Sequence, residues 1–294
     1  MTTVEKETLE NYKKAQGISN SAIIYAKTLL KEGVKILEVA EKIEDKIVQL
    51  GGKLAFPVNI SINDIAAHYT PDINDDIVFH ASDLAKIDIG VHVNGYIWDK
   101  AFTVCIGQSK HPLIDASEKA LDAAMKLIKP GVKISEISEV VEATVAEHGF
   151  NPIRNLCGHG LQRYNAHAQP TIPNGRNNIK EEVQLDSAVA MEVFTTDGGG
   201  WVKESDQALI FAFLQEKPVR MWEARQALQR SVVDFETLPF AKRWLADKKS
   251  KMSDLKIDMA LKQLLETGAI RQYPVLREES GGLVAQTEET IIVK

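Results

Sequence analysis

The sequence predicts an α+β domain built from two similar halves, with a helical insertion near its C-terminal end. Three observations predict this fold class. Stretches with helical apolar spacing come first, runs of β-forming residues bounded by turn residues follow, and this order then repeats. The character of the chain changes between residues 217 and 275. We therefore expect one domain of residues 1–213 plus 276–294, interrupted by an insertion of residues 214–275.

The first half begins with helices and continues with strands. Residues 3–50 are expected to be helical, and Gly51-Gly52 is expected to end the second helix. The apolar residues that follow the helical period there are Ala26, Leu29, Leu30, Val34 and Leu37. Residues 56–110 are expected to form short strands and turns.

The second half repeats this order. Two helices are expected near residues 113–129 and 134–148, with Pro130-Gly131 as the turn between them. Residues 150–213 are expected to form strands, and residues 283–293 the last strand. No sequence repeat is strong enough to prove that the two halves are related.

Residues 214–275 are expected to hold three helices, which include residues 224–228, 240–245 and 261–265. Leu238-Pro239 and a lysine-rich loop at residues 248–251 separate them. A three-helix unit with a basic loop is compatible with DNA binding. We favour a structural cap, because the chain carries a net charge of −6.

Composition excludes several classes of protein. The chain is 44% hydrophobic and 26% charged, as in ordinary globular proteins, and it has no run of about 18 apolar residues that could span a membrane. The N-terminal residues contain no signal-peptide core, which predicts a cytoplasmic protein. Two cysteines, Cys105 and Cys157, are too few for a disulfide framework and lack zinc-site spacing.

An acidic hairpin at residues 86–99 is the most informative segment. Asn94-Gly95 between two β-rich runs predicts a two-residue turn that pairs Val93 with Tyr96. Asp88 then lies opposite Ala101, and strand alternation places it on the same face as Asp99. Two carboxylates so close repel each other unless a cation lies between them. A metal site is one interpretation, and a solvated face with incidental aspartates is the other.

Three of the seven histidines have the setting of a functional residue. Flanking glycines leave the imidazole of His159 accessible, and small neighbours beside His68 and His167 suit side chains that face a pocket. Four others are expected to be solvated: His80, His92, His111 and His148.

Glu192 and Glu288 each interrupt a strand that is otherwise apolar. A buried carboxylate without a partner is costly, so such residues are normally paired or metal-bound. Taken alone, each glutamate is better explained by a salt bridge or an edge strand. Taken with Asp88, Asp99 and His159, they form an oxygen-rich set that suits two divalent ions sharing carboxylate bridges, and such a site hydrolyses bonds with an activated water.

The chain resembles the type II methionine aminopeptidases in their short archaeal form. The segments that carry this resemblance are residues 56–63, 66–71, 86–92, 158–159, 191–192, 237–241 and 284–286. The resemblance implies the pita-bread fold, which creatinase and prolidase share, with a helical, winged-helix-like insertion. It implies removal of the N-terminal methionine from new proteins whose second residue is small.

The resemblance also implies a role for each site residue. Asp88 would bind one metal ion, and Asp99 and Glu288 would bridge both. His159 would bind the other ion together with Glu192, which would also be the general base. His68 would contact the substrate amine or the leaving group, His167 would hydrogen-bond the scissile carbonyl, and Phe56 would line the methionine pocket.

The implied cofactors are two divalent metal ions, which could be Co, Mn, Fe or Zn. The implied partner is the N-terminal segment of newly made proteins, presented at or near the ribosome. No DNA and no membrane partner are expected, and a monomer is expected.

Three residues depart from the family pattern: Lys100, Val193 and Glu289. Strand alternation points Lys100 and Glu289 away from the metal face, so we expect them to form an ion pair behind the site. Two alternative functions stay open. One is a peptidase specific for bonds next to proline, and the other is a non-catalytic protein of this fold that binds protein or RNA partners.

Overall fold

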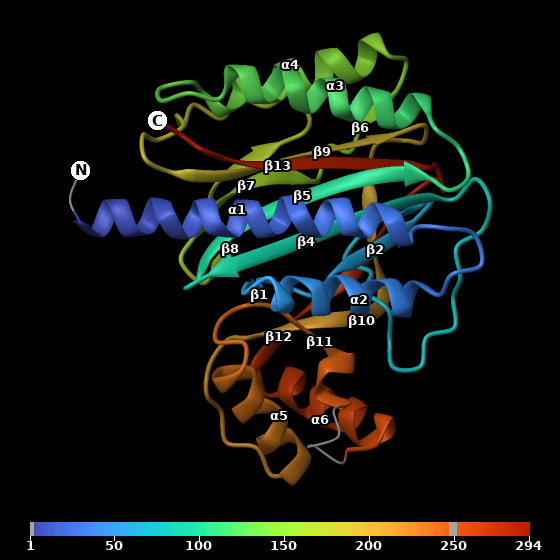
Figure 1. Ribbon diagram of the computed structural model, residues 1–294, viewed down its shortest axis with the longest axis vertical. Coiled ribbons are helices and arrows are strands. Elements are labelled where there is room, and N and C mark those ends of the chain that lie inside the picture. The colour runs from blue at the N-terminus through green and yellow to red at the C-terminus, as the bar shows by residue number, and fades with distance from the viewer. Residues whose placement is uncertain (1–2, 247–251) are drawn as a thin grey trace.

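A computed structural model describes residues 3–246 and 252–294 (Figure 1). Nine of the strands within these residues form one sheet in the order β1-β4-β5-β13-β9-β7-β8, while β2 pairs with β4 and β6 with β9. Their bounds are β1 Lys53–Leu54, β2 Asn59–Ile62, β4 Leu84–Val93, β5 Tyr96–Cys105, β6 Asn151–Pro152, β7 Cys157–Gln162, β8 Asn165–Pro173, β9 Ala188–Thr196 and β13 Val284–Ile292.

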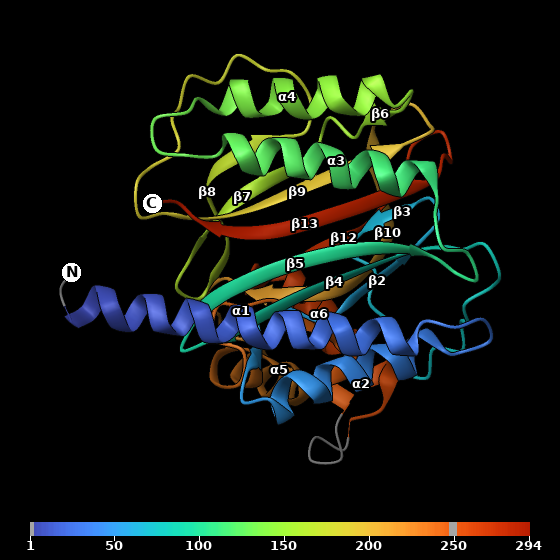
Figure 2. The same ribbon diagram turned by 45° about the horizontal axis from the view of Figure 1, so that its top comes forward.

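Two pairs of helices pack on this sheet, one pair on each half. Helix α1 (Thr3–Leu29) packs on β4 and β5 with α2 (Ile36–Gln49) beside it, and α3 (Pro112–Leu127) packs on β9 and β13 with α4 (Ile134–Glu147) beside it (Figures 1 and 2). This arrangement confirms the predicted order of elements in both halves. Gly51, at φ 86°, ends the α2 region as expected.

The alternation of side chains decides what faces these helices. In β4, Ile87 and Ile89 lie in the apolar core shared with α1 and α2. In β9, Val189 and Met191 lie in a second core shared with α3 and α4. Asp88 and Glu192 therefore project from the opposite face of the sheet. None of the described helices is long and apolar enough to cross a membrane.

The acidic hairpin has the predicted register. Val93 pairs with Tyr96, Asp88 with Ala101 and Gly90 with Asp99. Asn94 and Gly95 have φ values of 52° and 86°, the left-handed conformation that a tight hairpin turn of this type requires. The turn chemistry thus fixes which side chains share the face opposite the helices.

A second sheet, in the order β11-β10-β12-β3, faces that side of the large sheet, because residues of β3, β10 and β12 line one cavity with Asp88 and Glu192. Its strands are β3 (Ile65–Ala67), β10 (Val202–Phe213), β11 (Phe240–Ala241) and β12 (Ile270–Glu278), and helices α5 (Trp222–Val233) and α6 (Asp254–Glu266) lie beside it at the bottom of Figure 1. The predicted boundary between residues 275 and 276 falls inside β12.

The prediction of a helix that includes residues 240–245 is wrong. Residues 240–241 form β11, which pairs with β10, and residues 242–246 form a 3-10 helix, η1 (Lys242–Ala246). Apolar residues at 240, 241 and 245 suit a helix face, but tertiary pairing with β10 decides the structure of this short run. The lysine-rich loop at 248–251 lies outside the described residues.

Candidate active site

One cavity gathers every residue that the sequence analysis proposed for the site. It lies between the large sheet and the second sheet. Its lining includes Phe56, His68, Asp88, Asp99, His159, His167, Glu192 and Glu288. It also includes Asn59, Leu156, Pro239 and Tyr273, which sequence reasoning did not single out. Segments as far apart as residues 56 and 288 therefore meet at one place.

Four neighbouring strands of the large sheet, β4, β5, β13 and β9, bring the carboxylates together. Glu288 on β13 pairs with Ala101 on one side and with Glu192 on the other. Ala101 is in turn the partner of Asp88. Asp88, Glu288 and Glu192 thus lie in one cross-strand row, and Asp99, two residues before Ala101, lies on the same face of the sheet. Asp99 and Glu288 are almost fully buried.

His159 completes this row from β7. Its Nε2 lies 4.0 Å from Oδ2 of Asp99 and 3.9 Å from Oε1 of Glu288. The Nδ1–H faces the carbonyl oxygen of Gly160 at 3.4 Å, so the lone pair on Nε2 is directed at the carboxylates. A Cβ on Gly158 would lie 2.8 Å from the carbonyl oxygen of Ala190. This close approach of β7 to β9 is possible because residue 158 is glycine.

Gln286 is a site residue whose role the sequence analysis did not assign. Its Nε2 donates toward carboxylate oxygens of Asp88 at 3.2 Å, Glu192 at 3.4 Å and Glu288 at 3.4 Å. The backbone of Gln286 is held by Thr103, whose hydroxyl donates to the Gln286 carbonyl at 2.7 Å. The signal that could have found it is its place two residues before Glu288, on the same face of the strand.

The donor set fits divalent metal ions. Asp99, His159 and Glu288 offer ligand atoms that all lie within 4.8 Å of one another. Among the described side chains, Oδ1 of Asp88, Oδ1 of Asp99 and Oε1 of Glu288 are buried carboxylate oxygens with no hydrogen-bond partner. Unpaired buried oxygens of this kind are costly in a protein interior, and a cation between them removes that cost. Carboxylates with one imidazole are typical ligands of such ions.

Burial changes the protonation of these groups. It raises the pKa of Asp88 to about 6, and it raises the pKa values of Asp99, Glu192 and Glu288 well above their usual range, helped by the neighbouring carboxylates. Burial lowers the pKa of His159 to about 4, so this imidazole is neutral near pH 7. In the absence of metal the carboxylates share protons, and a bound cation replaces these protons.

Metal affinity should therefore rise with pH. Below pH 6 the carboxylates hold protons that a metal ion must displace, whereas neutral His159 has none to give. Each displaced proton changes the affinity about tenfold per pH unit, so we expect affinity for Mn²⁺ to rise at least about tenfold from pH 5 to pH 7. Calorimetric titrations in two buffers of different ionisation enthalpy measure both quantities. An affinity independent of pH, with no proton release, would contradict this assignment.

The candidate substrate residues surround the acidic row. The ring of Phe56 lies directly on Gly90, where an added Cβ would come within 2.2 Å of the phenyl carbons. The ring of Tyr273 lies 5.6 Å from that of His68 and 5.9 Å from that of His167. His167 in turn lies 4.7 Å from His159, and its exposed side chain lines the cavity. Tyr273, His68 and His167 thus form one wall of the cavity.

The expectation for His92 is wrong. This side chain is buried, and its Nδ1 accepts a hydrogen bond from the backbone N–H of Gly95 at 3.1 Å. The packing of Tyr164 against it, with ring centroids 5.7 Å apart, covers the outer end of the hairpin. The sequence did not show this long-range contact. Of the other three, His80 is exposed, while His111 caps α3 and His148 is half-buried.

Comparison with known proteins decides the family. The model of metallopeptidase family M24 matches residues 10–228. A methionine aminopeptidase of Thermococcus onnurineus is 46% identical over 91% of this chain and 90% of its own length. Another, from Archaeoglobus fulgidus, is 43% identical over 99% of this chain and 97% of its own length. The chain belongs to metallopeptidase family M24, among the archaeal methionine aminopeptidases.

Solved structures share this fold. A thermophilic Arx1 superposes with a TM-score of 0.87 at 18% identity, covering 99% of this chain and 89% of the other. A methionine aminopeptidase from Thermotoga maritima superposes with a TM-score of 0.71 at 20% identity, covering 100% of this chain and 94% of the other. The prolidase from Pyrococcus furiosus matches 64% of this chain and 56% of its own, with a TM-score of 0.58 and 24% identity. These likenesses confirm the pita-bread fold.

The ion pair expected behind the site is present. Lys100 and Glu289 form a salt bridge on the helix side of the sheet. Nζ of Lys100 also donates to Oδ1 of Asn20 on α1 at 2.9 Å, and Nε1 of Trp98 donates to Oε1 of Glu289 at 2.9 Å. Lys100 directly follows Asp99 on β5, and Glu289 directly follows Glu288 on β13. The ion pair therefore connects these two strands behind the two proposed bridging ligands.

Removing or exchanging the charges of Lys100 and Glu289 tests whether this ion pair supports metal binding. We expect K100M to weaken Mn²⁺ binding about tenfold, the lower end of the 10–100-fold range over which groups behind metal ligands tune affinity. The double variant K100E/E289K should recover most of the loss. Competition with a chelating dye gives the affinities. If K100M binds Mn²⁺ as tightly as the unchanged protein, the pair only stabilises the sheet.

Proposed function

We propose that this chain removes the N-terminal methionine from newly made proteins whose second residue is small, using two divalent metal ions. The observation that carries the proposal is the cavity itself. It gathers five metal-ligand candidates, Phe56, His68 and His167 in a chain that is 46% identical to a methionine aminopeptidase. The residues that would hold the ions are Asp88, Asp99, His159, Glu192 and Glu288, and Asp99 and Glu288 would be shared between the two ions.

The two ions, when bound, would supply an attacking water of lowered pKa and polarise the substrate carbonyl. Glu192 would accept the proton of that water as the water oxygen attacks the carbonyl carbon, and would then give it to the nitrogen of the breaking amide bond. Desolvation within the cavity and the neighbouring His159 lower the pKa of His167 well below its usual value, so this imidazole is neutral. It would donate a hydrogen bond to the carbonyl oxygen as negative charge develops there. His68 would contact the substrate amine or the leaving nitrogen.

The pocket for the methionine side chain is proposed on the side of Phe56. The phenyl ring, held against Gly90, offers the sulfur and methylene groups an apolar surface. Pro239, from the insertion, lines the same cavity.

Organisation and surroundings are proposed as well. Residues 1–213 plus 276–294 would be the catalytic domain, and residues 214–275 a winged-helix-like insertion that walls the cavity. The protein would act as a monomer in the cytoplasm, where N-terminal segments leave the ribosome. DNA and membranes are not proposed as partners.

Peptide cleavage tests the proposal. Purified protein, stripped of metal and reconstituted with Mn²⁺ or Co²⁺, should release methionine from Met-Ala-Ser and leave an X-Pro peptide intact. Cleavage of the X-Pro peptide alone would favour a proline-specific peptidase. Tight metal binding without cleavage of either peptide would refute the proposed reaction, and the absence of a tight site would favour a non-catalytic binding protein.

A further inference from the structure

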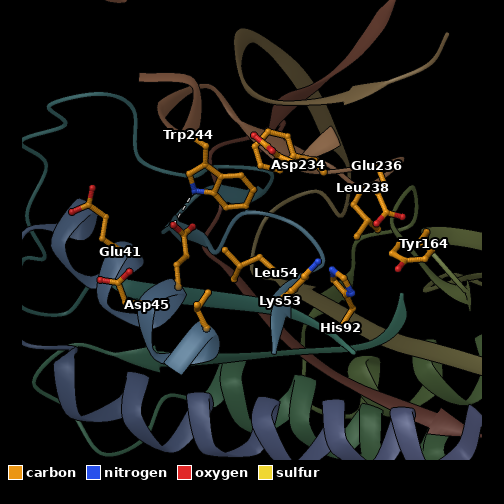
Figure 3. A pocket seen from close by; sticks show the side chains of 13 residues that line it. Glu41, Asp45, Lys53, Leu54, His92, Tyr164, Asp234, Glu236, Leu238 and Trp244 are labelled. Atoms are coloured by element: carbon orange, nitrogen blue, oxygen red, sulfur yellow. Dashed lines mark hydrogen bonds between the residues drawn. The ribbon is translucent and has the colours of Figure 1, made fainter. Parts of the chain in front are cut away.

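A buried ion pair joins the insertion to the catalytic half of the protein. Arg243 on η1 and Glu44 on α2 form a salt bridge, and both side chains are less than 10% exposed. Nε1 of Trp244, the next residue, donates to Oε2 of Glu44 at 3.0 Å. Figure 3 shows Trp244 above Leu54, with its indole nitrogen directed toward α2.

The partners of this ion pair lie in the two segments that carry Phe56 and His68. Oε1 of Glu44 accepts the backbone N–H of Val58 at 3.2 Å, two residues after Phe56. Nη1 of Arg243 donates to the hydroxyl of Thr70, two residues after His68, and to the carbonyl oxygen of Pro71 at 3.1 Å. The Thr70 hydroxyl donates in turn to the carbonyl oxygen of Val58 at 2.8 Å.

These contacts form one closed network, which we call the Arg243 clamp: Glu44, Val58, Thr70, Pro71, Arg243 and Trp244. A planar guanidinium with several fixed donors can hold two segments in one geometry, which the flexible point charge of a lysine cannot. The clamp lies beside a hollow of about 560 Å³ between α2 and the insertion, which Glu44 and Trp244 help to line (Figure 3).

Stability alone does not explain this pair. Removing two charges from water is expensive, and apolar side chains of similar volume at such places are often as stabilising or more so. What apolar side chains cannot supply is the set of directed hydrogen bonds to Val58, Thr70 and Pro71. The two charged side chains therefore determine the position of these backbone segments, and with it the position of Phe56 and His68.

We propose that Arg243 is a positioning residue that sets the side-chain selectivity of the methionine pocket. From the insertion it fixes, through Glu44 and Thr70, the two segments that place Phe56 and His68 in the cavity. The inference rests on the proposed function, because it takes Phe56 and His68 to be substrate residues.

Selectivity is the measurement that separates positioning from stability. The ratio of kcat/KM for Met-Ala-Ser to that for Leu-Ala-Ser does not depend on the fraction of protein that is folded. In R243M we expect this ratio to fall about tenfold or more, the range in which pockets discriminate side chains of similar size. KM for Met-Ala-Ser should rise by more than kcat falls. R243K keeps the positive charge but lacks the planar guanidinium with its several fixed donors, so it should recover the selectivity ratio only partly.

The double variant E44M/R243M removes both charges and leaves none buried alone. We expect its thermal midpoint to recover toward that of the unchanged protein while the selectivity ratio stays low. The matched control is K256M, because Lys256 is a cation of the insertion that pairs with Glu223 on α5 and contacts neither the Phe56 nor the His68 segment. K256M should keep the ratio.

Two results would overturn the inference. If F56A lowers the ratio while R243M and E44M/R243M keep it within twofold of the unchanged protein, the clamp is only structural. If F56A itself leaves the ratio unchanged, the placing of Phe56 in the methionine pocket is wrong and the inference falls with it.

Discussion

Replacing Glu192 by glutamine should reduce kcat for methionine release from Met-Ala-Ser by about 10²- to 10⁴-fold, the range that a general base contributes. Glutamine keeps the shape of the side chain and one oxygen for a metal ion, but it cannot accept the proton of the attacking water. The loss should therefore appear in kcat, with KM changed much less.

The fold of E192Q should be intact. Burial and the charge of Asp88 raise the pKa of Glu192, so its ionised form is unfavourable in the metal-free protein. Because an unfolded glutamate ionises near pH 4 and the folded one does not, Glu192 lowers metal-free stability as pH rises above that value. At pH 7.5 metal-free E192Q should thus unfold at the same temperature as the unchanged protein or higher. E182Q, at an exposed position, is the control for the substitution itself. Near-normal turnover in E192Q would refute the assignment of the base.

Asp99→Asn should remove metal binding as well as turnover. Asp99 is buried, its Oδ1 has no partner among the described residues, and its Oδ2 faces His159. As a bridging ligand it would contribute one oxygen to each ion, and asparagine offers one neutral oxygen. Groups behind metal ligands are worth about 10–100-fold in affinity or activity, so losing a direct ligand should cost at least about 100-fold.

Metal analysis of D99N after equilibration with Mn²⁺ should give fewer than two ions per chain, and methionine release should fall in parallel. D122N, an exposed substitution on α3, is the matched control and should keep both. Full occupancy and activity in D99N would show that the residue is not a ligand.

The hairpin shows what local sequence chemistry can predict. Asn94-Gly95 fixes the turn, the turn fixes the register, and the period of two then places Asp88 and Asp99 on one face. The salt bridge between Lys100 and Glu289 follows from the same alternation once the strand pairing is known. Such features depend on neighbours in sequence or on one pairing.

Long-range packing explains what could not be predicted. His92 is buried because Tyr164 from another hairpin covers it, and residues 240–241 form a strand because β10 lies beside them. The contact between Arg243 and Glu44 joins residues that are 199 positions apart. Gln286 lies in a stretch that carries the family resemblance, but only the structure shows it donating toward three carboxylates. No local pattern specifies these partners.

The most direct test of metal-dependent methionine release is a titration of metal-free protein with Mn²⁺, in which bound metal and methionine release from Met-Ala-Ser are followed together. We expect activity to appear as metal ions occupy the site formed by the five ligands, to reach its limit by about two ions per chain, and to stay absent in E192Q at full occupancy. Methionine release by the metal-free protein, or two bound ions without any methionine release, would contradict the proposed metal-dependent reaction.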